Sequence, residues 1–371
     1  MIAFFTVVMA SYFILLVLLL YGWNKLTPAD SSIGEQRVIS VVVPFRNEAN
    51  HIHHLILSLS DLNYPREKFE VIFVNDHSDD NSENVIKSLI HDKGNFSIVN
   101  LDATQRGKKS AITKGVLLAK GELIATTDAD CTVQRNWLHI ISTSFDDNMH
   151  LVFGGVVLKG SSFFSQLQAI EFSSLIGSGA ATLGLGFFTM CNGANMAYKK
   201  KSFELVNGYE GNLSVPSGDD EFLARKILTA FPQSIRFLKD KESVVTSRAA
   251  TTSKTFVHQR LRWAGKWKYN SSWLSKLLAV QILLVQMAFI GLLVLPFIWI
   301  EPVWLIFLLI VVKMSLEIAL IYPVARFLGA KWTWSAFLIL QLIYPLYVIG
   351  IGIMSLGMTY QWKGRSLSHK M

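Results

Sequence analysis

The sequence predicts an α/β domain with a doubly wound parallel sheet, inserted between membrane-spanning helices. Three observations support this: strand-like and helical segments alternate, apolar stretches lie at both ends of the chain, and acidic residues follow three of the strands. Of the 371 residues, 51% are hydrophobic and 17% are charged. This apolar excess excludes an ordinary soluble protein and a disordered one, and two cysteines exclude a disulfide framework.

Residues 1–22 are predicted to form an N-terminal transmembrane anchor. The first 21 residues are almost wholly apolar and carry no charge, and about 20 such residues span a bilayer. No Lys or Arg precedes the run and no clear small-residue cleavage site follows it, which favours a retained anchor over a signal peptide. Because Lys25 is the first basic residue after it, the positive-inside rule places the middle of the chain in the cytoplasm.

A second membrane region is predicted over residues 275–358, before a basic tail at residues 359–371. Its three apolar stretches run over residues 277–300, 303–322 and 334–358. Four crossings would leave the basic tail outside, against the positive-inside rule. Pro345 interrupts the last stretch, which is therefore the candidate for a segment that lies in the interface or turns back within the membrane.

Lys313 and Glu317 stand four residues apart inside the second of these stretches. Ionisable residues within a bilayer are costly and usually face the protein interior. A mutually neutralising pair that holds the helices together is the favoured interpretation, and contact with a polar part of a substrate is the alternative.

The middle region, residues 24–272, is long enough for one large domain. Residues 38–43 form a β-branched run, typical of a buried parallel strand. The elements after it are predicted as helix 48–59, strand 69–75, helix 82–90, strand 96–101, helix 108–119 and strand 123–127. This alternation predicts the parallel sheet, whose ligands bind beyond the carboxyl ends of the strands.

Three strands deliver polar residues to that edge of the sheet. Pro44 and Glu48 lie at the end of the first strand, Asp76 follows the second, and Asp128 and Asp130 follow the fourth. A single acid there could merely cap the next helix. In an extended chain, however, the two aspartates of the last group point to the same side. Two such carboxylates can hold a hard divalent ion that also binds phosphate oxygens.

Two charged turns precede predicted helices. Lys108 lies in the basic segment 106–109, which is either a solvated turn or a phosphate contact at a helix N-terminus. Asp219, Asp220 and a third acid precede the helical stretch 222–228. Acids favour helix N-termini, but three exceed what a cap needs, and their repulsion would raise the pKa of one, as a general base requires.

Together these segments resemble the family 2 glycosyltransferases, membrane-bound inverting enzymes with a GT-A fold. The similarity runs from Ser40 to Trp263, in the order VVVPFRNEAN, VNDHSDD, RGKKSA, TTDADC, NGANMAYKK, SGDDEFLARK and QRLRW. The family's DxD motif, (E/D)D base motif and QxxRW motif are all present. Here GDD stands where many members have an ED pair, and the carboxylate is kept. No phosphate-loop, dinucleotide or GxSxG motif occurs, which weakens those alternatives.

The resemblance implies a GT-A (Rossmann-like) domain that binds a nucleoside-diphosphate sugar, with a UDP-sugar favoured. The residues implied to bind this donor are Pro44, Glu48, Asp76, Lys108, Asp128 and Asp130. The two aspartates of the DxD motif would also bind Mg²⁺ or Mn²⁺.

The resemblance also implies a catalytic residue and a gate. Asp220 would be the general base on the acceptor hydroxyl. The residues implied to close over the diphosphate and the acceptor are Gln259, Arg262 and Trp263, although a basic amphipathic helix on the bilayer would also explain their segment. Asp219 and Asn195 are weaker candidates for a place near the acceptor. Residues 161–190 are either plain core or an element that lines an acceptor entrance.

The expected reaction is that of a hexosyltransferase in a bacterial inner membrane, with its catalytic domain in the cytoplasm. Three C-terminal stretches and one anchor are sparse for a polymer channel, which favours a lipid acceptor over a glycan polymer. A processive polysaccharide synthase is the alternative, and an inactive scaffold or transport subunit is the alternative from another class. The net charge of +8 suits an anionic membrane surface, and only this charge favours nucleic acid, which is not an expected partner.

Overall fold

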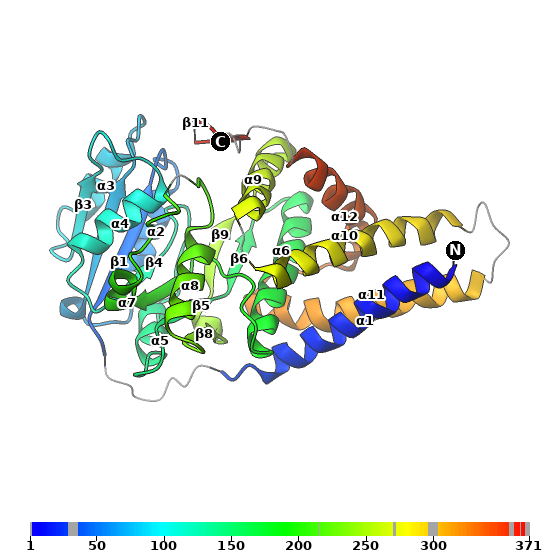
Figure 1. The fold of residues 1–371 in the computed structure, drawn as a ribbon. Coiled ribbons are helices and arrows are strands. Elements are labelled where there is room, and N and C mark those ends of the chain that lie inside the picture. Colours follow the sequence, from blue (N-terminus) through cyan, green and yellow to red (C-terminus); the bar gives the residue numbers. More distant parts are fainter. Residues whose placement is uncertain are drawn as a thin grey trace. The chain divides into compact units, whose positions relative to one another are not determined.

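The computed structural model describes residues 2–28, 36–213, 215–269, 272–295, 303–355, 360–363 and 365–367. The chain divides into two compact units (Figure 1). The helical unit comprises Met1–Leu26, Gly160–Thr189 and Ala249–Met371, and the sheet unit comprises Thr27–Lys159 and Met190–Arg248. The single domain predicted over residues 24–272 therefore contains segments of both units. Much of the predicted basic tail, residues 359–371, lies outside the described residues.

A seven-stranded mixed sheet forms the centre of the sheet unit. Its spatial order is β3 (Phe96–Asn100), β2 (Phe69–Asn75), β1 (Ile39–Phe45), β4 (Leu123–Thr126), β7 (Met196–Lys199), β5 (Leu151–Gly154) and β8 (Ile235–Leu238). The first four strands in this order are parallel to one another, as the alternation of strands and helices predicts. Every residue of β1 is buried, which explains its continuous apolar run.

The sheet is not parallel throughout, as the term doubly wound parallel sheet would suggest, because β7 runs the other way. This strand is antiparallel to both β4 and β5. Met196, its first residue, pairs with Thr126, the last residue of β4, so the chain enters β7 from the edge at which β4 ends. A separate parallel pair joins β6 (Val156–Lys159) to β9 (Val245–Arg248).

Six helices connect these strands within the sheet unit. They are α2 (Ile52–Ser60), α3 (Ser82–Ile90), α4 (Lys108–Leu118), α5 (Trp137–Thr143), α7 (Lys200–Leu205) and α8 (Asp219–Ala230), with short 3₁₀ turns at Arg66–Lys68 and Lys241–Ser243. α4 packs against β1 and β2. α2 begins later than predicted from residue 48, because Asn47 adopts a left-handed φ of 53° and the chain turns before entering the helix.

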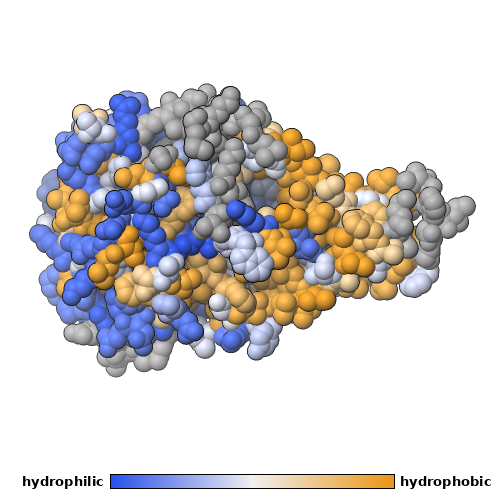
Figure 2. Space-filling view, viewed as in Figure 1, coloured by the Kyte–Doolittle hydropathy of each residue, from blue (hydrophilic) through white to orange (hydrophobic). Residues whose placement is uncertain are grey.

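The helical unit contains α1 (Ile2–Lys25), α6 (Phe163–Gly184), α9 (Ser253–Gly265), α10 (Trp273–Val294), α11 (Val303–Leu328) and α12 (Trp334–Met354). A 3₁₀ turn at Lys266–Tyr269 and a short hairpin, β10 (Tyr360–Trp362) and β11 (Arg365–Leu367), belong to the same unit. Among the described residues, four helices, α1, α10, α11 and α12, are long and apolar enough to cross a membrane. Hydrophobic residues dominate the face over α1, α10 and α11 in Figure 2.

Small residues allow close helix contacts in this unit. A Cβ added at Gly22 of α1 would lie 2.2 Å from the carbonyl oxygen of Ala181 in α6, and one at Gly184 would lie 2.1 Å from that of Gly22. Only glycine fits at such close backbone approaches between helices. α12 continues through Pro345 to Met354, so the predicted interruption does not break the helix.

The two ionisable residues of α11 form a buried polar network. Lys313 Nζ lies 2.8 Å from Glu317 Oε1 and donates to Gln341 Oε1 of α12 at 2.6 Å. Tyr12 of α1 donates to Glu317 Oε1 at 2.8 Å, and the Lys313 ammonium lies 4.4 Å from the ring centroid of Phe289 in α10. The pair therefore holds helices together, as the favoured interpretation predicts.

We expect Lys313→Leu to destabilise the helical unit more than the double substitution Lys313→Leu/Glu317→Leu. The single variant leaves the Glu317 carboxylate buried without its cation, at a cost of about 3–5 kcal/mol, whereas the double variant removes both charges. The SDS concentration at the midpoint of unfolding in mixed micelles measures the difference. A double variant that unfolds before the single variant would contradict this explanation.

Candidate active site

The parallel strands bring the predicted site residues to one edge of the sheet. β2, β1 and β4 are neighbours, and their carboxyl ends lie together. Arg46 and Glu48 follow β1, Asp76 follows β2, and Asp128 and Asp130 follow β4. Pro44 lies one residue before the end of β1, opposite Val74 of β2.

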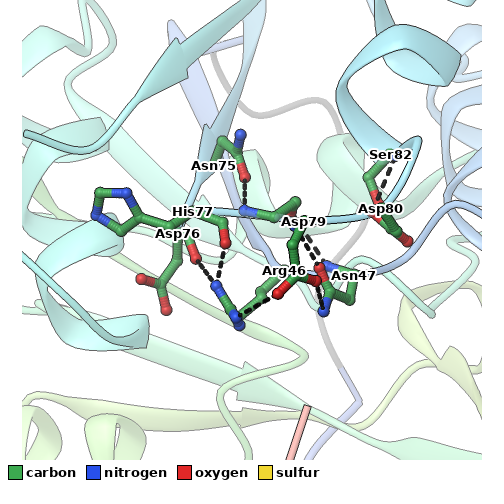
Figure 3. A network of polar contacts seen from close by, with 9 residues as sticks. Arg46, Asn47, Asn75, Asp76, His77, Asp79, Asp80 and Ser82 are labelled. Atoms are coloured by element: carbon green, nitrogen blue, oxygen red, sulfur yellow. Dashed lines mark hydrogen bonds and ion pairs between the residues drawn. The ribbon is translucent and has the colours of Figure 1, made fainter. Parts of the chain in front are cut away.

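Arg46 ties the loops after β1 and β2 together (Figure 3). It is only 8% exposed, and its Nη1 donates to the backbone carbonyls of Asp76, at 2.9 Å, and of His77. Its Nη2 lies 3.2 Å from Asp79 Oδ2. Asn47 joins the same network, because its amide donates to Asp79 Oδ1 at 2.6 Å and accepts from the Asp79 backbone at 3.0 Å.

Strained backbone accompanies this clamp. Asn47 and His77 have φ values of 53° and 55°, a region that residues other than glycine rarely adopt. A second set of bonds holds the following residues: the Glu48 backbone donates to Ser82 Oγ at 2.7 Å, and the Ala49 backbone donates to Asp80 Oδ2 at 3.1 Å. The two loops that carry the buried Glu48 and Asp76 are thus held together by several hydrogen bonds.

Lys108 joins three of the predicted motifs. Its Nζ, at the N-terminus of α4, lies 2.8 Å from Asp128 Oδ1 of the DxD motif and 2.9 Å from Asp219 Oδ2 of the GDD segment. Burial alone would lower the pKa of Lys108, but the two carboxylates raise it above its ordinary value. Burial likewise opposes ionisation of Asp219, yet Lys108 holds the pKa of that carboxyl below its ordinary value. Lys108 and Asp219 are therefore both charged at neutral pH.

Asp220 lies beside this bridge at the first turn of α8. The helix begins at Asp219, earlier than predicted, after Gly218 with a left-handed φ of 78°. Asp220 Oδ2 accepts from the backbone of Gly193 at 3.2 Å. A Cβ at Gly193 would lie 2.8 Å from Asp219 Oδ2, so only glycine fits here without displacing the carboxylates. The turn around Gly193 therefore borders both acids.

The third acid of this segment has a structural partner. Glu221 is 3% exposed, and its Oε1 accepts from Arg225 at 2.7 Å and 3.1 Å. The three acids thus differ in their partners: Asp219 pairs with Lys108, Asp220 contacts the Gly193 turn, and Glu221 pairs with Arg225 within α8.

The aspartates of the DxD motif suit a divalent cation that is shared with phosphate. Two carboxylates flank one residue at the end of β4, and the Asp128 side chain is 38% exposed, so solvent reaches it. The described residues contain no group of three or more His, Cys, Asp or Glu side chains that could enclose an ion. A hard cation that completes its coordination with phosphate oxygens and water fits such a pair.

Asn195, a weaker candidate for a place near the acceptor, is buried inside the sheet unit, and its proximity to an acceptor stays a prediction. Its Oδ1 accepts from Trp137 Nε1 at 2.9 Å, and its Nδ2 donates to the carbonyls of Gly155 and Ser243, each at 2.8 Å. Because these bonds engage both ends of the amide, the side chain has a structural role in the sheet unit. Asp219, the other weak candidate, is in the charged cluster.

The QxxRW residues Gln259, Arg262 and Trp263 lie on α9 of the helical unit. Their predicted closure over the diphosphate stays a prediction.

Arg260 is not among the site residues predicted from the sequence, because the QxxRW motif leaves its position unspecified. It is 3% exposed, pairs with Glu171 of α6, and lies 4.3 Å and 4.6 Å from the ring centroids of Trp263 and Phe256. Two features pointed to it: an acid within the apolar segment 161–190 and an extra arginine in QRLRW. Residues 163–184 of that segment form α6, whose Glu171 anchors the helix that carries the motif.

Parts of the chain are similar in sequence to known glycosyltransferases. Residues 40–206 match the model of the glycosyl transferase family 2. Glycosyltransferase AglE of Haloferax volcanii is 29% identical over 119 residues, which cover 32% of this chain and 39% of that protein. A poly-β-1,6-N-acetyl-D-glucosamine synthase of Staphylococcus aureus is 29% identical over 181 residues, which cover 46% of this chain and 42% of that protein. The chain thus spans about two fifths of the length of these relatives.

Among solved structures, the mannosyltransferase PcManGT from Pyrobaculum calidifontis, in complex with GDP-Man and Mn²⁺, has a similar fold. The TM-score is 0.58 at 19% sequence identity, and the match covers 95% of this chain and 98% of that one. At this identity the likeness concerns the fold alone. Residues 40–206 are thus similar to the family 2 glycosyltransferases, and the sheet unit has a fold of the GT-A type.

Proposed function

We propose that the protein is an inverting, metal-dependent glycosyltransferase that moves a sugar from a nucleoside-diphosphate sugar to a membrane-associated acceptor. The observation that carries this proposal is the Lys108 bridge, which joins the DxD motif to the GDD segment beside Asp220. In this proposal, the Lys108 ammonium would face the diphosphate and the neighbouring Asp220 carboxylate would accept the hydroxyl proton. The match of residues 40–206 to the family 2 model supports the reaction class, and the four apolar helices of the described residues support the membrane setting.

In the proposed reaction, Asp220 accepts the proton of the acceptor hydroxyl as its oxygen attacks the anomeric carbon of the sugar. The bond between that carbon and the diphosphate oxygen breaks, and the bonding electrons leave with the nucleoside diphosphate. Lys108 stabilises the negative charge that develops on the leaving group. One displacement inverts the configuration at the anomeric carbon.

Mg²⁺ or Mn²⁺ would be held by Asp128 and Asp130 together with the diphosphate of the donor. When bound, such an ion neutralises charge on the leaving diphosphate. The nucleotide would lie against Pro44, Glu48 and Asp76, at the edge of the sheet that Arg46 organises. A UDP-sugar is the favoured donor. The QxxRW residues of α9 would contact the diphosphate and the acceptor.

A lipid is the favoured acceptor, and a polysaccharide is the second candidate. Four membrane-capable helices in the described residues favour a single lipid substrate over a channel built by one chain. The similarity to a poly-β-1,6-N-acetyl-D-glucosamine synthase favours the polymer. In either case the catalytic domain would face the cytoplasm, at the inner membrane of a bacterium.

A donor screen tests this proposal. Purified full-length protein in native lipid extract is incubated with UDP- and GDP-sugars and Mn²⁺, and the release of nucleoside diphosphate and the size of the product are measured. Turnover with one donor and a single-sugar lipid product would support lipid transfer, whereas a high-molecular-mass product would identify a polymer synthase. Folded protein that turns over no donor would favour the inactive scaffold.

We expect Arg46→Gln to weaken nucleotide binding about 10-fold or more. Loss of charge-assisted hydrogen bonds at a buried site costs roughly 1.5–3 kcal/mol and would release the Asp76 loop. Titration calorimetry with UDP and GDP gives the dissociation constants. Arg135→Gln is the matched control, because Arg135 makes only an exposed pair with Asp61 in the same unit. Equal affinities for the two variants would exclude this role of Arg46.

A further inference from the structure

The loop between α7 and α8, residues 206–218, lies directly before the two acids of the proposed site. It contains no regular helix or strand over its described residues, and several of its residues have positive φ. Backbone carbonyls in such a segment need partners from elsewhere in the protein. Two lysines supply them.

Lys226, in the middle of α8, binds the first half of this loop. Its Nζ donates to the carbonyls of Val206 at 3.3 Å, Gly208 at 2.9 Å and Glu210 at 2.7 Å. Three carbonyls of consecutive turns thus converge on one ammonium, which organises the part of the loop farthest along the chain from Asp219.

Lys109, at the start of α4, binds the second half. Its Nζ donates to the carbonyls of Asn212 at 2.7 Å and Val215 at 2.8 Å. The residue is 4% exposed, and burial lowers the pKa of Lys109 to about 8 against the attraction of Asp219 and Asp220. A buried ammonium is costly unless it is hydrogen-bonded, so these two bonds are substantial.

The same ammonium also contacts the helix that carries the acids. It lies 4.7 Å from the ring centroid of Phe222, in the first turn of α8. A Cβ at Gly218 would lie 2.8 Å from that ring, so the ring packs against the left-handed residue at which the helix begins. Lys109 therefore touches both the end of the loop and the first turn of α8.

Two adjacent lysines thus hold the start of α8: one binds a carboxylate of its first turn, and the other binds the loop before it. Lys108 binds the carboxylates of Asp128 and Asp219. Lys109 binds the backbone carbonyl of Val215, before Asp219, and contacts the ring of Phe222, after it. We propose that Lys109 is a positioning residue that fixes Asp220 for proton transfer by holding the loop and the first turn of α8 in place. This inference rests on the proposed function, in which Asp220 is the base.

Lys109→Met, which keeps the length of the side chain but removes its donors, tests this role in the full-length protein in lipid. We expect kcat for sugar transfer to fall about 10- to 100-fold, because a displacement of about 1 Å at a catalytic group has effects of this size. The dissociation constant of the nucleotide should change less than about 2-fold. Lys109→Gln keeps two N–H donors and should restore part of kcat.

Lys226→Met is the matched control, because it removes a clamp of the same kind from the far half of the loop. We expect it to lower the thermal unfolding midpoint while leaving kcat close to that of the wild type. Cleavage by a glutamate-specific protease at Glu210 reports release of the loop independently of activity. It should increase in both methionine variants.

The outcomes separate this inference from the proposed function. Wild-type protein without turnover would overturn the function and, with it, the role of Lys109. Active wild type together with a folded Lys109→Met variant of unchanged kcat would overturn only the positioning role. Equal losses of nucleotide affinity and kcat would also overturn it, since they indicate general disruption. If Lys109→Met does not fold, Lys109→Gln decides: wild-type kcat with increased cleavage contradicts the inference.

Discussion

Asp220→Asn should abolish almost all sugar transfer while leaving the donor bound. Loss of a general base lowers kcat about 10²- to 10⁴-fold, and asparagine keeps the size and an acceptor oxygen for the Gly193 backbone. Because Lys108 and the DxD motif are untouched, the dissociation constant of the nucleotide should stay within about 2-fold of the wild type. Initial rates with saturating donor, together with calorimetric titration of the nucleotide, measure the two effects.

Glu221→Gln is the control for this prediction. Glu221 is the next residue along α8, but its carboxylate pairs with Arg225. We expect this variant to unfold at a lower temperature and to keep most of its kcat. A Glu221→Gln variant as inactive as Asp220→Asn would remove the distinction between the two acids and transfer the base assignment to the segment as a whole.

Lys108→Met should lower kcat/KM about 10²- to 10³-fold, the loss expected when a donor that stabilises developing negative charge is removed. The same substitution leaves Asp128 and Asp219 close together without their shared cation. Asp219, whose side chain is only 10% exposed, then has a buried charge that burial alone disfavours. Steady-state kinetics and the unfolding midpoint of the purified variant test both consequences.

The pH dependence of stability provides a second measurement on the same variant. In the wild type, Lys108 holds the pKa of Asp219 below its ordinary value, so the bridge stabilises the fold at neutral pH and is lost only as the pH falls through the lowered pKa. In Lys108→Met, burial is no longer opposed by this cation and raises that pKa. The difference in unfolding midpoint between wild type and variant should therefore be largest near pH 7 and shrink toward pH 4. A difference independent of pH would contradict the ion-pair explanation.

The parts of the fold that follow from local sequence pattern could be predicted closely. The strand Phe69–Asn75 and the helix Ser82–Ile90 have the predicted bounds, because a nearly continuous buried run and the amphipathic spacing of Ile86 and Ile90 are local features of the sequence. The position of Asp128 beyond β4 also followed from pattern, since parallel strands place their carboxyl ends together. The antiparallel β7 could not be predicted in this way, because strand direction depends on where the chain re-enters the sheet.

Long-range partners account for the remaining differences. The polar, loop-located Asn195 has the composition of a site residue, and only its bonds to Trp137, Gly155 and Ser243 reveal a structural role. Arg260 looks like one basic residue among several, and only the tertiary structure pairs it with Glu171, 89 residues away along the chain. The role of a buried polar side chain depends on such tertiary partners, which cannot be deduced from the spacing of residues in the sequence.

Sugar transfer with Asp220 as the base is tested most directly by one stoichiometry: nucleoside diphosphate released against sugar transferred to a membrane-extractable acceptor. It is measured for the wild type and for Asp220→Asn. We expect one nucleoside diphosphate to be released for each sugar transferred, and both products to depend on added acceptor. Both products should be lost in the variant. Folded wild-type protein that binds nucleotide yet transfers no sugar from any UDP- or GDP-sugar, or equal transfer by both proteins, would contradict this expectation.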